Sequence, residues 1–175
     1  MLNLKEIIRP LIKVSVHVRF HILVSRFIYY KIPFLGKWIS FFLDWLFLII
    51  YGIDMKSFSV NVKNLNISHP NGILLGGNGI KSNGKVVINS GVMFGGTSPT
   101  NKLYLERHKT QSVFVLGNNV IIGMGSSLHG PLTICDNVIV GSMSLVNKDI
   151  VEPGIYAGIP VKKIAEFNSN KWPIH

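Results

Sequence analysis

The sequence predicts a mainly β protein, a triangular parallel β-helix that follows a short α-helical segment. Three observations lead to this fold class: a six-residue hydrophobic period after residue 54, Gly and Asn residues between the periodic positions, and a helical pattern before residue 52. The clearest part of the period is a column of six aliphatic residues, Leu116, Ile122, Leu128, Ile134, Val140 and Val146. A second column stands four positions after each of these, at Val120, Ser126, Leu132, Val138, Ser144 and Ile150.

A period of six fits a coil with three short sides, each a strand that points one aliphatic residue inward, with Gly or Asn at the corners. Three hexads make one coil, so residues 54–160 predict about five coils. A β-sandwich is disfavoured because its turns recur about every 8–12 residues. Upstream, Leu74, Ile80, Val86 and Val92 keep the spacing less regularly. Residues 97–112 lack it, and we expect them to leave the β-helix as an external loop.

Two helices are predicted before the β-helix. The first covers residues 3–31, where an apolar side accompanies a basic ridge at every fourth position, Lys5, Arg9, Lys13, His17 and His21. Pro33 and Gly36 end it, because the residue before proline avoids the helical region and glycine favours a turn. The second runs from about Lys37 to Tyr51. The predicted organisation is a helical segment over 1–52, a β-helix over 53–165 and a C-terminal tail over 166–175.

Charge and cysteine content restrict the partners and the compartment. The chain has 175 residues with 18 basic and 8 acidic ones, a formal charge of +10 that indicates an anionic partner. Nucleic acid, an anionic lipid surface and a phosphate-bearing small molecule are the classes that such a charge allows. About half of it lies in residues 1–37; an anionic membrane surface is an expected partner and nucleic acid is not. The most apolar run, residues 39–53, is too short to span a bilayer and contains Asp44, and no signal-peptide pattern is present. The single cysteine, Cys135, favours the cytoplasm.

From residue 50 to about residue 165 the chain resembles the hexapeptide-repeat acyltransferases. The resemblance rests on the segments Tyr51–Asp54, Ser68–Leu75, Val92–Thr97, Glu106–His108 and Ala157–Lys162. Within that family it resembles the serine O-acetyltransferase-like branch, which includes capsule and lipopolysaccharide O-acetyltransferases. The resemblance implies a left-handed β-helix, a homotrimer with active sites between adjacent subunits, and acetyl-CoA as the acetyl donor.

The resemblance also implies catalytic roles for three residues. His69 matches the general base that removes the proton of the acceptor hydroxyl, a task suited to a neutral imidazole. Asp54, which lies 15 residues earlier, would orient that imidazole and stabilise its charged form. His108 in the inserted loop would orient the hydroxyl or polarise the thioester, and Arg107 beside it would bind the acceptor.

For the donor, the resemblance implies a groove in which backbone atoms contact the pantetheine arm of acetyl-CoA. The matching positions are Gly95, Gly96, Met124 and Ser142, with Lys162 and Lys163 near the phosphates. No metal is expected. Cys135 lies beside an interior column and is interpreted as a small buried hydrophobe, so the acetyl group passes directly to the acceptor without an acyl-enzyme.

The acceptor is predicted from a departure from the family pattern. Ser68 stands where serine acetyltransferases place an Asp before the catalytic His, and the helical segment is much shorter than theirs. We therefore favour a sugar hydroxyl of a cell-surface polysaccharide precursor, acetylated in the cytoplasm at the inner face of the membrane. Serine acetylation in cysteine biosynthesis is the alternative.

Two other function classes remain open. One is a γ-carbonic-anhydrase-like zinc protein using His69, His108 and His129, and the other is a non-catalytic membrane-surface scaffold. The N-terminal helices fit either lipid binding or packing within the trimer. Asp44, expected to make a polar contact at a subunit or lipid boundary, has no assigned role, nor do His17, His21 and His129.

Overall fold

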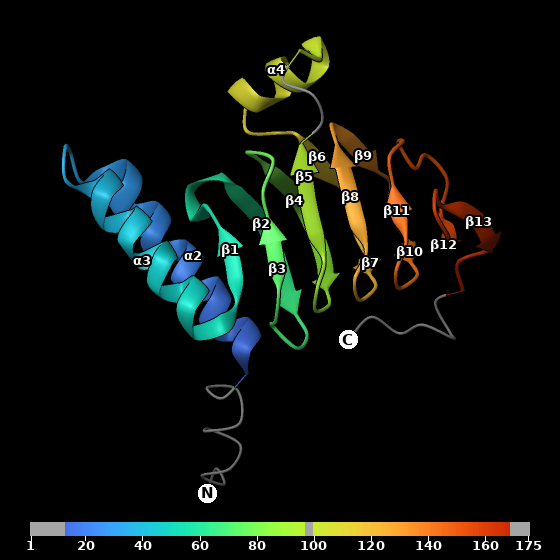
Figure 1. Cartoon of the computed structure of the whole chain (residues 1–175), viewed down its shortest axis with the longest axis horizontal. Helices are drawn as coiled ribbons and strands as arrows, with labels where there is room; N and C mark the ends of the chain where they lie inside the picture. The colour runs from blue at the N-terminus through green and yellow to red at the C-terminus, as the bar shows by residue number, and fades with distance from the viewer. Residues whose placement is uncertain (1–12, 97–99, 169–175) are drawn as a thin grey trace, which may run out of the picture.

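In a computed structural model that describes residues 13–96 and 100–168, an α-helical hairpin stands against one end of a parallel β-helix (Figure 1). The hairpin consists of α2 (Val14–Lys31) and α3 (Gly36–Tyr51). Leu35 and Gly52 flank α3, and Gly52 ends it in the left-handed conformation with φ 63°. The helix expected from about Lys37 thus begins at Gly36.

The β-helix has three faces. The first face is a five-stranded parallel sheet, β1 (Ile53–Met55), β3 (Ile73–Leu75), β5 (Met93–Gly96), β8 (Ser127–Gly130) and β11 (Leu145–Val146). The second face holds β6 (Phe114–Leu116) and β9 (Leu132–Ile134), and the third holds β7 (Val120–Ile122), β10 (Val138–Val140) and β12 (Gly154–Ala157). Two long strands, β2 (Val60–Ile67) and β4 (Ile80–Ile88), pair with a register shift after Val62 and continue from the second face to the third. A 3-10 turn, η1 (Ser57–Ser59), precedes β2, and the antiparallel β13 (Lys162–Ala165) closes the far end.

The interior confirms both predicted columns. Every member from Leu116 to Ile150 is at most 3% exposed. The first column therefore stacks aliphatic side chains continuously along the axis, and the second includes two buried serines, Ser126 and Ser144. Burial of such side chains, worth roughly 1.5–3 kcal/mol each, is the main term that holds the coils together.

One upstream position differs from the prediction. Leu74 points outward, and its neighbours Ile73 and Leu75 are buried instead. The cause is coil length: Asp54 pairs with Leu74 after 20 residues and Leu74 with Met93 after 19, whereas Ser127 pairs with Leu145 after the regular 18. An extra residue reverses which face of a strand a side chain takes.

A buried polar network fastens the hairpin to the β-helix. The Asp44 carboxylate of α3 accepts hydrogen bonds from the Ser57 amide at 2.9 Å and the Ser57 hydroxyl at 2.6 Å. From α2, the Ser25 hydroxyl lies 3.2 Å and His21 Nε2 lies 2.8 Å from the same carboxylate. Asp44 is therefore an internal junction of α2, α3 and η1, not the subunit or lipid contact expected from the sequence. Its partners offset the cost of burying it.

Several basic residues of α2, both in the predicted ridge and beside it, make hydrogen bonds to other elements. Arg26 donates to the Val60 carbonyl at 3.1 Å and to Asn61 at 3.0 Å, and Arg19 donates to Asn64 at 3.4 Å. Both arginines therefore tie α2 to β2. His17 of the ridge lies 2.6 Å from the Tyr51 hydroxyl, while Lys5 and Arg9 fall outside the described residues.

The outer side of the hairpin is strongly apolar. On α3, a stripe at helical spacing is formed by Trp38, Phe42, Trp45 and Ile49, each 54–74% exposed. A matching stripe on α2 is formed by Phe20, Leu23, Phe27 and Tyr30, each 55–67% exposed. We call these two stripes together the apolar hairpin face. Across the described ranges, no helix has both the length and the hydropathy needed to cross a membrane.

Candidate functional site

The corner that leads from the third face into the first carries a row of candidate residues, and we call it the leading edge. Backbone hydrogen bonds link its successive turns: Gly91 donates to the Asn71 carbonyl, Gly125 to Ser90, and Met143 to Met124, all at 2.8–2.9 Å. His69, Met124 and Ser142 lie in these turns. The leading edge thus aligns the proposed base with two of the proposed acetyl-CoA contacts along one line parallel to the axis.

His69 occupies an uncommon backbone conformation at the start of this line. Its φ is 56°, in the left-handed region that non-glycine residues seldom adopt, and its side chain is exposed. Such conformations cost free energy and concentrate at functional sites. Its neighbour Ser68 is fixed by its backbone amide, which donates to the Ile88 carbonyl at 3.0 Å.

Asp54 lies close to this corner but is not bonded to His69. It occupies the middle of β1 with an exposed side chain, and within the described residues no hydrogen bond or ion pair involves its carboxylate. The preceding Gly52 packs against the leading edge, where an added Cβ would lie 3.4 Å from the Gly72 amide. Asp54 thus lies opposite Leu74 on the neighbouring strand β3, five residues after His69 in the chain, and its carboxylate can accept a hydrogen bond.

The opposite corner, where the chain leaves the first face, carries the other candidates and is called the trailing edge. Gly95 and Gly96 end β5 there, and α4 (Lys102–Lys109) follows in the predicted insertion as a short helix rather than a loop (Figure 1). Among the described residues, no atom lies within 4 Å of an added Cβ at Gly95, so this side of its backbone has room for a ligand. At Gly96 the Cβ would lie 2.6 Å from the Tyr104 ring, so this glycine makes room for α4.

Side chains of α4 hold it against the β-helix. Arg107 donates to the Thr133 hydroxyl of β9 at 3.2 Å. Asn78 donates to the His108 carbonyl at 3.0 Å and also lies 3.3 Å from His108 Nδ1. The exposed ring of His108 remains at the trailing edge.

Strand direction therefore separates the predicted site into two halves. His69 precedes β3 and the insertion follows β5, and these strands are parallel neighbours. One chain consequently places His69, Met124 and Ser142 at the start of the first-face strands, and Gly95, Gly96, Arg107 and His108 at their end. Strands advance about 3.3 Å per residue, which puts the two groups roughly 10 Å or more apart across the face.

The two candidate lysines near the C-terminal end differ in their contacts. Lys163 lies 2.9 Å from Glu166 and 3.5 Å from Glu152, and the hydrogen bond to Glu166 raises the pKa of Lys163. Lys162 is exposed and has no ion pair within the described chain. Of these two lysines, Lys163 has its charge offset by nearby carboxylates, and Lys162 is the better candidate to bind a phosphate of acetyl-CoA.

Cys135 has the environment of a packing residue. It is half-buried beside the core, and burial raises the pKa of its thiol above the usual value. A raised pKa lowers the thiolate fraction on which nucleophilic attack depends.

The histidines proposed for zinc lie on separate elements. His69 is on the leading edge and His108 on α4, while His129 of β8 lies 3.2 Å from the Ser127 hydroxyl. In the part of the chain that the structure describes, no three His, Cys, Asp or Glu side chains group closely enough to hold a metal ion.

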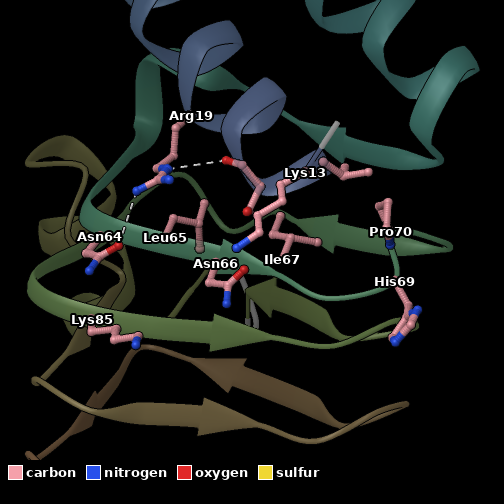
Figure 2. A pocket seen from close by; sticks show the side chains of 11 residues that line it. Lys13, Arg19, Asn64, Leu65, Asn66, Ile67, His69, Pro70 and Lys85 are labelled. Carbon is pink, nitrogen blue, oxygen red and sulfur yellow. Dashed lines mark hydrogen bonds between the residues drawn. The ribbon is translucent and has the colours of Figure 1, made fainter. Parts of the chain in front are cut away.

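A pocket of about 510 Å³ adjoins His69 and was not predicted (Figure 2). Helix α2 forms one side, β2 and β4 form the other, and its cationic members are Lys13, Arg19 and Lys85. The sequence signals two of these as part of a basic helix but gives no sign that Lys85 joins them, because β4 lies more than 50 residues away in the chain.

Comparisons with known proteins agree with this architecture. Residues 115–148 match the protein-family profile described as bacterial transferase hexapeptide (six repeats). The chain is 34% identical over 91 residues to the bifunctional protein GlmU of Streptococcus uberis, covering 51% of this chain and 19% of that protein. It is 42% identical over 53 residues to galactoside O-acetyltransferase of Escherichia coli, covering 30% and 26%. It is 36% identical over 78 residues to serine acetyltransferase of Synechococcus elongatus, covering 45% and 29%. The chain thus spans less than a third of the length of each of these relatives.

Solved structures show the same fold over most of the chain. Serine acetyltransferase of Neisseria gonorrhoeae superposes with a TM-score of 0.76 at 20% identity, covering 92% of this chain and 58% of that one. The Brucella abortus serine acetyltransferase in complex with coenzyme A gives 0.73 at 19% identity, covering 88% and 57%. Together with the hexapeptide repeat, this likeness identifies the fold as a left-handed parallel β-helix.

Proposed function

We propose that the chain is a hexapeptide-repeat transferase, an acetyl-CoA-dependent O-acetyltransferase whose acceptor is a sugar hydroxyl of a cell-surface polysaccharide precursor; the repeat match over residues 115–148 and the similarity to galactoside O-acetyltransferase support this. The observation that carries the proposal is the leading edge, where an exposed, left-handed His69 is aligned with Met124 and Ser142. Acetyl-CoA is a long molecule, and its pantetheine arm can lie along the backbone of the leading edge while its thioester reaches His69 at one end.

His69 acts as the general base in a direct transfer. The acceptor oxygen attacks the thioester carbonyl while its proton passes to the imidazole, and the C–S bond then breaks to release coenzyme A as the thiol after reprotonation. Asp54 accepts a hydrogen bond from the other ring nitrogen and stabilises the imidazolium. The weakly acidic Cys135 thiol takes no part.

A homotrimer supplies the missing half of each site. The leading edge of one subunit faces the trailing edge of the next, so His69 and Asp54 of one chain meet Gly95, Arg107 and His108 of its neighbour. This arrangement is proposed because one chain holds the two groups at opposite ends of the same strands.

Acetyl-CoA phosphate binding provides a matched test. We expect Lys162→Ala to raise the KM for acetyl-CoA by about 5- to 20-fold, since a charge-assisted contact is lost. Lys163→Ala should change that KM by less than about twofold, because Glu166 and Glu152 already offset its charge. Initial rates at varied acetyl-CoA check both variants, and equal effects of the two would contradict the assignment of Lys162.

The acceptor is tested with a panel of alcohols. We expect acetyl transfer to nucleotide sugars or lipid-linked oligosaccharide, and little transfer to L-serine, because Ser68 offers no carboxylate for the ammonium group. Thioester consumption with product identification by mass spectrometry measures this. Efficient acetylation of L-serine, with kcat/KM at or above ~10⁴ M⁻¹s⁻¹ and no sugar product, would establish the serine alternative.

We place the trimer in the cytoplasm, with the apolar hairpin face lying on the inner membrane surface. Two observations support this location: exposed aromatic stripes on both helices, and basic residues at their ends, including Lys31 and Lys37. Aromatic and basic residues together favour the interface of an anionic bilayer. Three copies in one trimer strengthen a weak individual attraction.

Vesicle binding tests this location. We expect Trp38→Ser with Trp45→Ser to reduce the fraction bound to anionic vesicles by at least ~10-fold, since two large side chains no longer enter the interface. Val151→Ser with Ile164→Ser, at sites 78% and 65% exposed on the β-helix, is the matched control and should bind like the wild type. Cosedimentation measures both. Unchanged binding together with a weakened trimer would show instead that the hairpins pack between subunits.

A further inference from the structure

The pocket beside His69 is a positively charged site next to the proposed base. It lies between the start of α2 and the third-face parts of β2 and β4, and at one end it reaches His69 and Pro70 (Figure 2). Its volume of about 510 Å³ is within the usual range of small-molecule sites. A ligand bound there would have part of its structure within reach of the imidazole.

The charges in this pocket have one sign. Lys13, Arg19 and Lys85 line it, and none of the lining residues that the structure describes is an Asp or a Glu. Asn64, Asn66 and Ser15 add uncharged polar groups. Three cations converging on one cavity attract an anion and hold it by charge-assisted hydrogen bonds.

Arg19 is already positioned for such a contact. Its Nε donates to the Ser15 carbonyl at 3.3 Å and one terminal nitrogen donates to Asn64 at 3.4 Å, which holds the guanidinium at the rim of the pocket. A guanidinium held in place loses little conformational freedom when it binds an oxyanion.

We propose that this pocket binds a phosphate group of the acceptor, so that the acceptor is a phosphorylated or diphosphate-linked sugar whose hydroxyl reaches His69. The inference rests on the proposed function and specifies its substrate class. A dianionic phosphate matches three cations better than a single carboxylate does. The same charges repel the ammonium group of an amino acid, which gives a second reason why serine is a poor acceptor.

The test compares one sugar with and without its phosphate. In the double variant Lys13→Ala with Lys85→Ala, we expect the KM for the sugar phosphate to rise about 10- to 100-fold, with kcat nearly unchanged. The KM for the unphosphorylated sugar and for acetyl-CoA should stay within about twofold. Lys63→Ala with Lys148→Ala removes the same charge from exposed positions outside the pocket and is the matched control. A nucleotide sugar and a lipid-linked sugar diphosphate, assayed in parallel, identify the source of the phosphate.

Calorimetric titration of the sugar phosphate separates this inference from the proposed function. Binding that the double variant loses and the control keeps supports the pocket, even if the wild type acetylates no sugar and the proposed function fails. An unchanged KM and unchanged calorimetric affinity in the double variant would overturn the inference while leaving acetyl transfer intact. An equal rise in the KM for acetyl-CoA would also overturn it, because the pocket would then serve the donor.

Discussion

Replacement of His69 by Ala is expected to lower kcat by about 10²- to 10⁴-fold while the trimer and the affinity for acetyl-CoA remain unchanged. The range is that of a lost general base, and the exposed side chain makes no packing contribution whose loss would unfold the coil. Asp54→Asn should lower kcat less, because it removes only the orienting carboxylate. Steady-state kinetics, calorimetry with coenzyme A and sedimentation measure the three properties separately.

A second histidine on the first face is the control for this variant. His129 is exposed, and its ring contacts the Ser127 hydroxyl. We expect His129→Ala to retain most of the turnover. If His69→Ala keeps nearly wild-type activity, His69 is not the general base. Equal losses at His69 and His129 would favour a site that needs several histidines, as in the zinc alternative.

The regular coils were predictable because an interior column has one physical requirement, an aliphatic or small side chain at every sixth residue. That requirement holds from Leu116 to Ile150, where coils have 18 residues. It fails at Leu74 because the coil from Leu74 to Met93 has 19 residues, one more than the regular 18. Periodicity cannot reveal such an insertion until the paired strands are known.

Contacts between distant elements were not predictable. Asp44 looks anomalous in an apolar helix, and only the packing of α2 and η1 supplies the four donors around it. Likewise the basic residues of the first helical segment look alike in sequence, yet Arg26 binds β2 while Lys13 lines a pocket that Lys85 completes. These roles depend on which surfaces meet, and a local pattern does not carry that information.

The division of the site into two edges has the same origin. Motif spacing groups Asp54, His69, Arg107 and His108 as one set, but parallel strands put the base before β3 and the arginine after β5. The sequence thus contains all four residues, but one folded chain does not bring them together in one site. The decisive test of the proposed trimer is whether defects at the two edges complement each other.

Mixed trimers of His69→Ala chains and Arg107→Ala/His108→Ala chains are therefore expected to regain activity that neither parent has. Each parent alone has a defect in every site and should show at most about 1% of wild-type turnover. In a cyclic trimer that contains both chains, one interface pairs the intact leading edge of one variant with the intact trailing edge of the other. Turnover per trimer should then be about one third of the wild-type value. The measurement uses co-expressed chains with two affinity tags, purified for both tags, with two tagged copies of His69→Ala as the inactive control. If the mixed trimers stay as inactive as their parents, the leading and trailing edges do not meet between subunits, and the site must be assembled within one chain by a movement of α4.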